Sequence, residues 1–220
     1  MKKKFIFFII IFLDFFAPCE FPLRSIPLII HGLKNSFNNK ISSDFTLIKL
    51  IFKFNTLKKS TIYFSLGTNI GNRKFNLINC ISRINKNIGN VEKISSIYKN
   101  PAIGFDGDFF FNCCIEVSSF LAVKDVLSGI LCIEKEMGRT KRLANEYESR
   151  IIDIDIILFG NTIVNNKKLV IPHPRYSHRD FVLIPLLEIN NKLEDPQSGQ
   201  LISVFLDSIQ KNKMIEKLDF

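Results

Sequence analysis

Zinc ligands and disulfide partners are scarce in this sequence. It holds three histidines and five cysteines, and no two cysteines stand at the C-x-x-C spacing. Structural zinc sites need clusters of these residues at regular spacing, and a complete disulfide framework needs an even number of cysteines. Neither kind of scaffold is indicated. We expect the cysteines to be reduced and to pack in the interior, which favours a cytoplasmic location.

Two common nucleotide-binding signatures are also absent. The sequence has no G-x-x-x-x-G-K-[S/T] run and lacks the motif set of protein kinases, so P-loop enzymes and protein kinases are excluded. A phosphate-binding protein of another kind must use carboxylates on strands and cations on loops.

No apolar run is long enough to span a bilayer, which takes ~20 residues. The apolar stretch at 5–13 follows three lysines in the manner of a signal peptide, but Asp14 interrupts it. The segment after it shows no sustained hydrophobic period. After Met1 no methionine occurs until Met137, so a start codon near residue 60 that is not AUG could have been passed over in favour of Met1. We therefore expect residues 1–59 to be an extension that is disordered or not part of the native protein. Residues 60–220 are expected to form one domain.

The formal charge of +9 lies mostly in this extension. Residues 1–60 carry ten Lys and Arg against three Asp and Glu, and the rest of the chain carries 20 against 18. A strongly basic body would indicate nucleic acid or a membrane surface as partner. Because this body is nearly neutral, we expect neither a nucleic-acid partner nor membrane contact. We also expect a monomer.

From residue 61 the sequence alternates between two apolar patterns. Strand-like runs occupy residues 61–66, 91–98, 112–118 and 151–159, and helix-like steps occupy 75–88 and 123–133, closed by Gly89 and Gly138. A hairpin is predicted from 162–164 and 169–171, and helices from 181–189 and 204–209. The order predicts an α+β fold with a ferredoxin-like β-α-β-β-α-β core, an added hairpin and C-terminal helices. The residues expected to face the core from the first helix are Phe75, Ile78, Ile81, Ile84 and Ile88.

Two aspartates stand close together in the strand-like run at 151–159. Alternate side chains of a strand share a face, so Asp153 and Asp155 point the same way and the isoleucines between them point the other way. Neighbouring carboxylates repel each other, and a hard cation such as Mg²⁺ relieves that repulsion. The pair predicts a magnesium site that also takes phosphate oxygens. A solvated surface strand is the alternative, because D-x-D alone is a weak pattern.

Basic residues flank the aspartate pair. Arg139, Lys141 and Arg150 precede it, and His173, between two prolines, follows together with Arg179. Cations clamp phosphates while carboxylates hold the bridging metal, and the prolines stiffen the backbone around the histidine. This pattern predicts a triphosphate site. A solvated basic loop and a structural histidine are the alternatives.

Asn112 follows three phenylalanines at 109–111. An amide offers a donor and an acceptor side by side, which matches the edge of a pterin or purine ring, and aromatic side chains stack on the face of such a ring. Core packing is the alternative, and we expect it for two of the three phenylalanines.

Seven segments taken together resemble one enzyme family. They are Y-F-S-L-G-T-N-I-G-N from residue 63, S-I-Y-K-N-P from 96, F-N-C from 111, I-E from 133 through G-R at 138, R-I-I-D-I-D-I-I-L-F-G from 150, I-P-H-P-R from 171 and R-D-F-V-L-I-P-L from 179. In this order, over residues 61–209, the chain resembles 6-hydroxymethyl-7,8-dihydropterin pyrophosphokinase.

The resemblance implies transfer of the β,γ-pyrophosphate of ATP to the pterin hydroxymethyl group, with release of AMP, in folate biosynthesis. It implies two Mg²⁺ ions on Asp153 and Asp155, with ATP as co-substrate. The implied ATP contacts are Glu134, Arg139, Arg150, His173 and Arg179. The implied pterin contacts are Asn100, Ile103, Phe110, Asn112 and Phe181. Arg139, Lys141 and Arg150 are the implied catalytic cations.

The sequence departs from the family in the loop before Arg150. A Trp-Gly-Pro-like run is usual there, whereas this chain reads N-E-Y-E-S from residue 145 and has no tryptophan. Lys141 stands where arginine is common, which keeps the charge but loses the bidentate fork. Two alternatives to an active enzyme therefore stand: a catalytically silent relative, and a ferredoxin-like module that binds nucleic acid.

Overall fold

The computed structural model describes residues 58–139, 149–209 and 215–218. Almost all of the predicted extension, together with Lys141, lies outside these ranges. Within them, no helix is both long and apolar enough to cross a membrane.

The described chain begins with strand β1 (Ser60–Thr68), helix α4 (Arg73–Asn87) and strands β2 (Asn90–Ile94), β3 (Ile97–Asn100) and β4 (Phe110–Ser119). Helix α5 (Val123–Glu136), strand β5 (Asp153–Phe159) and the hairpin of β6 (Val164–Asn166) and β7 (Leu169–Ile171) follow. The 3-10 turn η1 (Tyr176–His178), helices α6 (Asp180–Ile189) and α7 (Ile202–Ser208) and strand β8 (Glu216–Leu218) come last. This order confirms the predicted α+β fold with its hairpin and C-terminal helices.

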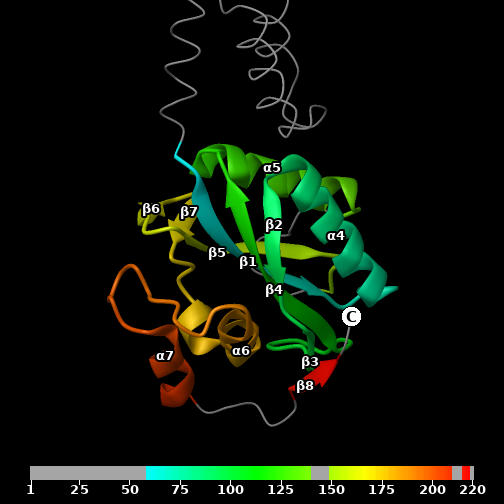
Figure 1. The fold of residues 1–220 in the computed structure, drawn as a ribbon. Helices are drawn as coiled ribbons and strands as arrows, with labels where there is room; N and C mark the ends of the chain where they lie inside the picture. The colour runs from blue at the N-terminus through cyan, green and yellow to red at the C-terminus, as the bar shows by residue number, and fades with distance from the viewer. Residues whose placement is uncertain (1–57, 140–148, 210–214, 219–220) are drawn as a thin grey trace, which may run out of the picture.

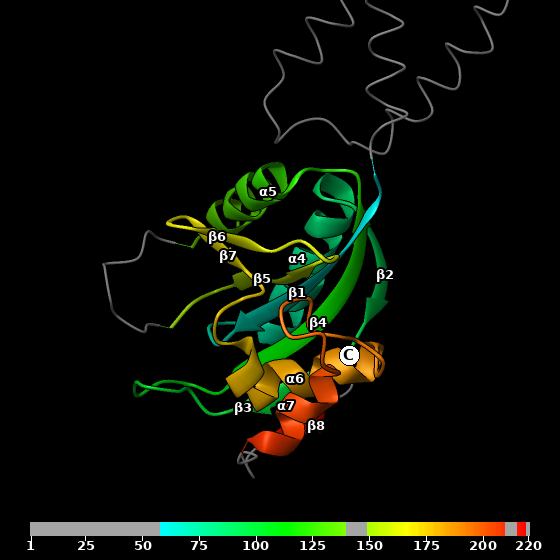
Figure 2. The ribbon, with the colours of Figure 1, turned by 90° about the vertical axis from the view of Figure 1, so that its left-hand side faces the viewer.

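One antiparallel sheet organises the domain. Its strands run in the order β5-β1-β4-β3-β8, and β2 also pairs with β4. With β1 and β4 at the centre, this is the ferredoxin-like arrangement. Helices α4 and α5 cover one face of the sheet, and α6 and α7 cover the other (Figures 1 and 2). Strand β5 is the outer strand on one side, and within the described residues no further strand pairs with its outer edge, near which the β6–β7 hairpin lies (Figure 1).

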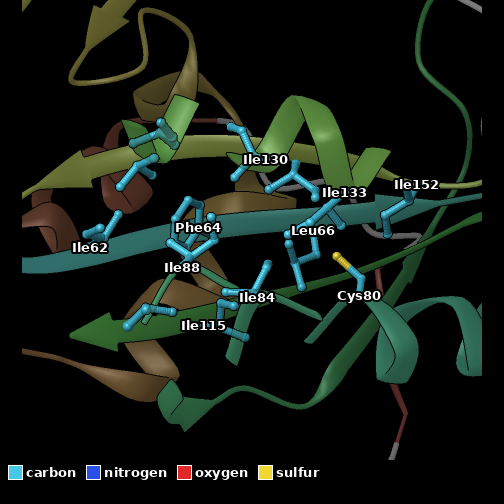
Figure 3. Packing of buried hydrophobic residues seen from close by; sticks show 14 of the residues in the cluster. Ile62, Phe64, Leu66, Cys80, Ile84, Ile88, Ile115, Ile130, Ile133 and Ile152 are labelled. Carbon is cyan, nitrogen blue, oxygen red and sulfur yellow. The ribbon is translucent and has the colours of Figure 1, made fainter. Parts of the chain in front are cut away.

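The larger apolar core lies between the sheet and helices α4 and α5 (Figure 3). Alternate residues of β1, namely Ile62, Phe64 and Leu66, point into it and are fully buried. They meet Ile84 from α4 and Ile130 from α5. Because a shift of one residue would turn this apolar set to the other face, its burial fixes the register of β1.

The buried side of α4 differs from the predicted stripe. Ile84 is buried as expected, but Phe75 and Ile78 are 58% and 50% exposed. Leu77 and Cys80 are fully buried in their place. Apolar residues occur on both sides of this helix, so steps of three and four residues fit two faces. Contact with the sheet decides which face is buried.

A smaller apolar cluster lies on the other face, between the sheet and α6. Tyr63 and Cys114 project into it from β1 and β4, and Val182 projects from α6. Cys80, Cys113 and Cys114 are free and buried, as predicted for packing cysteines. The prediction is wrong for Cys132, which is half-buried and disulfide-bonded.

The strands differ from the prediction at three points. Strand β1 continues through Gly67 and Thr68, two residues beyond the predicted end at residue 66. The strand predicted at 91–98 is two strands, because at Ser95 the side chain takes part in the pairing: its Oγ accepts a hydrogen bond from the N–H of Cys114 at 2.9 Å. The short strand β8, which pairs with β3, was not predicted.

Candidate active site

The two aspartates of β5 stand on the face of the sheet that α6 covers. Ile154 and Ile156 belong to the core on the opposite face and are 4% exposed. The side chains of Asp153 and Asp155 are 21% and 32% exposed. The predicted shared face of the two carboxylates is therefore present.

Two arginines hold Asp153 from different directions. Arg139, just beyond α5, places Nη2 2.8 Å from Asp153 Oδ1, and Arg150 places Nη1 2.7 Å from Oδ2. The arginine side chains are only 15% and 9% exposed. Charge-assisted hydrogen bonds are stronger than neutral ones, so Asp153 orients both cations toward one space.

A histidine and a third arginine face Asp155. His173 Nε2 and Arg179 Nη1 each lie 3.8 Å from Asp155 Oδ2. The backbone N–H of Arg175 donates to His173 Nδ1 at 3.2 Å, which leaves the ring proton on Nε2. Burial, together with the charges of Arg179 and Arg175, lowers the pKa of His173 to about 4. The ring is therefore neutral at pH 7 and presents Nε2–H as a donor.

Glu134 supports this group from α5. It is 5% exposed, and its Oε1 accepts from Arg139 Nη1 and from the N–H of Ile154, the latter at 2.8 Å. That N–H lies on the outer edge of β5, so Glu134 satisfies a donor that the sheet leaves unpaired. Burial raises the pKa of Glu134 to about 7, although the charge of Arg139 acts in the opposite direction.

A cavity of about 670 Å³ opens beside these residues. It follows β5 between α5 and the β6–β7 hairpin, and the two aspartates, Arg139 and His173 belong to its lining. Its apolar walls include Leu127 and Leu131 of α5 and Leu169 and Val170 of β7, and Lys167 and Lys168 line it from the hairpin turn. A cavity with apolar walls and a few convergent charged groups suits a nucleotide-sized ligand.

On the same face, β1 separates the aspartates from a pair of amides. Gly67 pairs with Asp153 on one side and with Asn112 on the other. Asn112 Nδ2 donates to Asn100 Oδ1 at 2.5 Å, and Phe110 stands two residues before Asn112 on β4. A Cβ on Gly67 would lie 2.7 Å from Asn112 Oδ1. Asp153, Gly67 and Asn112 thus lie in one row across three neighbouring strands. Because the glycine has no side chain, the space between the carboxylate and the amide stays open.

The other predicted pterin contacts are Phe181 and Ile103. Phe181, at the start of α6, packs partly against the smaller cluster, and Arg179 Cζ lies 5.6 Å from its ring centroid. Ile103 is 54% exposed in the connection between β3 and β4. The expectation that two of the three phenylalanines pack in the core is wrong, because Phe111 packs against it while Phe109 is 39% exposed and Phe110 faces the amides.

Sequence reasoning missed Asn69 as a site residue. It is 2% exposed, its Oδ1 accepts from the N–H of Arg150 at 2.7 Å, and its Nδ2 donates to Ser149 Oγ at 2.9 Å. Nδ2 also lies 3.4 Å from the carbonyl oxygen of Asp108. Asn69 thereby ties the end of β1 to the backbone of Arg150 and to the connection before β4. The sequence gives little sign of this, because the helix cap that its neighbourhood indicates is Asn72.

The donor set fits magnesium. Within the described ranges no three His, Cys, Asp or Glu side chains gather to enclose a metal ion. Mg²⁺ in proteins is commonly bound by one or two carboxylates together with phosphate oxygens and waters. Asp153 and Asp155, which are partly exposed and border the cavity, match that pattern.

Comparison with known families gives one match across this site. A family model described as 7,8-dihydro-6-hydroxymethylpterin-pyrophosphokinase (HPPK) matches residues 63–191. That range contains every site residue described above.

Two curated relatives carry the same activity in their names, and a third is named for folic acid synthesis. The 2-amino-4-hydroxy-6-hydroxymethyldihydropteridine pyrophosphokinase of Aquifex aeolicus is 35% identical over 138 residues, which cover 62% of this chain and 84% of that protein. The enzyme of the same name from Haemophilus influenzae is 31% identical over 159 residues, 71% of this chain and 97% of that protein. The folic acid synthesis protein of Pneumocystis carinii is 33% identical over 186 residues, 84% of this chain, which spans only 24% of that protein's length.

Solved structures share the fold. The HPPK-DHPS protein of Plasmodium falciparum with pteroate matches with a TM-score of 0.58 at 13% identity, over 73% of this chain and 48% of that chain. The same protein with SDX-DHP gives a TM-score of 0.59 at 15% identity, over 73% and 48%. This chain thus spans about half the length of those structures, and at this identity the likeness concerns the fold alone.

Proposed function

The chain belongs to the 7,8-dihydro-6-hydroxymethylpterin-pyrophosphokinase family, and we propose that it transfers pyrophosphate from ATP to 6-hydroxymethyl-7,8-dihydropterin. ATP is the co-substrate, AMP is released, and the reaction belongs to folate biosynthesis. The observation that carries this proposal is the row of Asp153, Gly67 and Asn112 across three adjacent strands, with the cavity beside the aspartate. A polyphosphate held at the aspartate and a flat heterocycle held at the amide meet over Gly67.

The nucleoside of ATP lies in the cavity between α5 and the hairpin. Leu127 and Leu169 supply apolar walls for the base, and Lys168 adds a positive charge to the lining. The phosphates then point toward Arg139 and Arg150, whose guanidinium groups already face a common carboxylate. A planar fork of donors matches phosphate oxygens in a bidentate manner.

Asp153 and Asp155 would hold the magnesium, and we expect two ions. When bound, Mg²⁺ neutralises charge on the phosphate oxygens and so favours attack on phosphorus. His173 adds no charge of its own, because its ring is neutral, and it donates Nε2–H toward the same region. Arg179 supplies a further cation beside Asp155.

The pterin is held on the other side of Gly67. The hydrogen bond between Asn112 and Asn100 fixes which amide atoms face a ligand. Phe110 and Phe181 supply ring faces on which a pterin stacks. Asn100 therefore acts through its side-chain amide, which holds Asn112 in place.

The transfer replaces one P–O bond by another and releases the proton of the hydroxyl group. The hydroxyl oxygen of the pterin bonds to Pβ, its proton leaves to solvent or phosphate, and AMP departs with the oxygen that bridged Pα and Pβ. Charge grows on that oxygen, so cations fixed beside it stabilise the transition state more than the ground state. Arg139 is fixed by Glu134 and Asp153, and the backbone of Arg150 is fixed by Asn69.

A cytoplasmic location is part of the proposal. Its support is three free, buried thiols, those of Cys80, Cys113 and Cys114, since disulfides are rare in the cytosol. The disulfide at Cys132 counts against it.

The mass of the pterin product distinguishes this reaction from ordinary kinase activity. After incubation of the full chain with ATP, Mg²⁺ and the pterin, we expect a pterin that has gained two phosphate groups, together with AMP. A pterin with one phosphate group, together with ADP, would overturn the proposal.

A further inference from the structure

Arg73 occupies a position that does not favour a cation. It is the first residue of α4, Lys74 follows it, and no acidic residue lies in the first turn of that helix. The N-terminus of a helix carries a partial positive charge, so cations are unfavourable there. A contact outside the helix accounts for the arginine better than helix stability does.

That contact is with the start of β4. Arg73 Nη1 donates to the carbonyl oxygen of Phe109 at 2.8 Å, and Arg73 Cζ lies 4.6 Å from the ring centroid of Phe111. A guanidinium group is attracted to the face of an aromatic ring, and its planar shape lets it stack and donate at once. Arg73 thus holds the residues on either side of Phe110.

Phe110 itself points away from Arg73. Phe111 packs against the core on the side of α4, and adjacent side chains of a strand point to opposite faces. Phe110 therefore lies on the face that carries the amides. Its ring meets Phe105 edge-on at 6.2 Å, and its Cδ1 would lie 3.7 Å from a Cβ on Gly67. The direction of the ring depends on the backbone that Arg73 holds from behind.

We propose that Arg73 is a positioning residue for the pterin. It fixes the start of β4 so that Phe110 stacks on the pterin while Asn112 meets the pterin edge, and it touches neither the substrate nor the reacting atoms. The inference rests on the proposed function, because it names the same substrate at the same site.

The test compares two variants that each remove one positive charge from the same helical turn. Arg73→Met removes both contacts with β4, whereas Lys74→Met alters an exposed neighbour. Calorimetry on the full chain measures the binding of 6-hydroxymethyl-7,8-dihydropterin in the presence of Mg²⁺ and α,β-methylene-ATP, in which the Pα–Pβ link cannot be cleaved by the transfer.

We expect Arg73→Met to weaken pterin binding about tenfold, since it loses one charged hydrogen bond and one cation–π contact. The affinity for the ATP analogue and the melting temperature should stay close to those of the wild type. Lys74→Met should keep both affinities. Arg73→Lys, which retains the charge but not the planar fork, should recover part of the loss.

Three results would overturn the inference. Equal pterin affinity in Arg73→Met and wild type would do so and leave the proposed function standing. A parallel fall in both affinities and in the melting temperature would show a purely structural role. Absence of pterin binding by the wild type would remove the proposed function and this inference with it.

Discussion

Asp153 and Asn112 stand on the same face of the sheet, and both pair with the residue that lies between them on β1, Gly67. Neighbouring strands are about 4.8 Å apart, so the two backbones are separated by about 10 Å. A metal-bound pyrophosphate group at one end and a hydroxymethyl pterin at the other fit that distance. Glycine in a strand interior often marks such a close approach by a ligand.

Gly67→Ala should therefore impair pterin binding. The added Cβ would lie 2.7 Å from Asn112 Oδ1, so the amide has to turn from its place. We expect the Kd for the pterin to rise about tenfold, because a polar contact of the substrate is lost. Calorimetry with Mg²⁺ and α,β-methylene-ATP measures it.

A matched control for this variant is Gly129→Ala. A Cβ there would stand 2.4 Å from Ile88 Cδ1, a close contact between α5 and the end of α4. Pterin affinity should stay normal in this control. If Gly67→Ala also keeps normal pterin affinity, pterin binding does not depend on the absence of a side chain at Gly67.

Asp153→Ala and Asp155→Ala should each remove most of the activity and leave the fold intact. Loss of a group that stabilises transition-state charge typically costs about 10²-fold or more in kcat. AMP release measures the activity, and circular dichroism measures the fold. Asp207→Ala, at an exposed position of α7, is the control and should have no effect. Near wild-type turnover in either site variant would defeat the metal assignment.

Asn69→Ala should lower both stability and kcat. It removes the acceptor for the N–H of Arg150 and the donor to Ser149 Oγ. A buried donor left without a partner costs ~1–3 kcal/mol of the free energy of unfolding, and Arg150 loses a constraint on its position. Urea unfolding and AMP release measure the two effects. Ser149→Ala should be milder because the bond to Arg150 stays, and an unchanged kcat in Asn69→Ala would refute a positioning role.

The free energy of unfolding should fall as the pH rises above 10, the ordinary pKa of tyrosine. Burial raises the pKa of Tyr63 to about 12, and it also raises the pKa of Tyr98 and Tyr176. Because the folded-state pKa is the higher one, this stabilisation is complete below the unfolded pKa and is lost as the pH rises toward the folded one. The slope of the unfolding free energy against pH follows the difference in bound protons between the unfolded and folded states, and each tyrosine adds up to one proton to that difference. Urea unfolding at several pH values measures it, and Tyr63→Phe should reduce the slope; an equal slope would contradict the shift.

Local patterns predicted much of the fold and part of the site. Strand alternation placed Asp153 and Asp155 on one face, and helical steps located α4 and α5. The choice of buried face on α4 was not predictable, because Phe75 and Ile78 continue an apolar pattern that only contact with the sheet can resolve.

Residues whose partners are distant in sequence escaped prediction for a related reason. The partner of Asn69 is 81 residues away and that of Arg73 is 36 residues away. Gly67 matters only because β1 separates β4 from β5, which is a property of strand order. Periodicity and capping signals act over a few residues and contain none of this information.

AMP formation by the full chain, with ATP, Mg²⁺ and 6-hydroxymethyl-7,8-dihydropterin and with each omitted in turn, tests the central claim most directly. We predict AMP only when all three are present, in an amount equal to the pterin pyrophosphate formed, and the same result from residues 60–220 alone. AMP released without the pterin, or no AMP from a folded protein that binds both substrates, would contradict the claim.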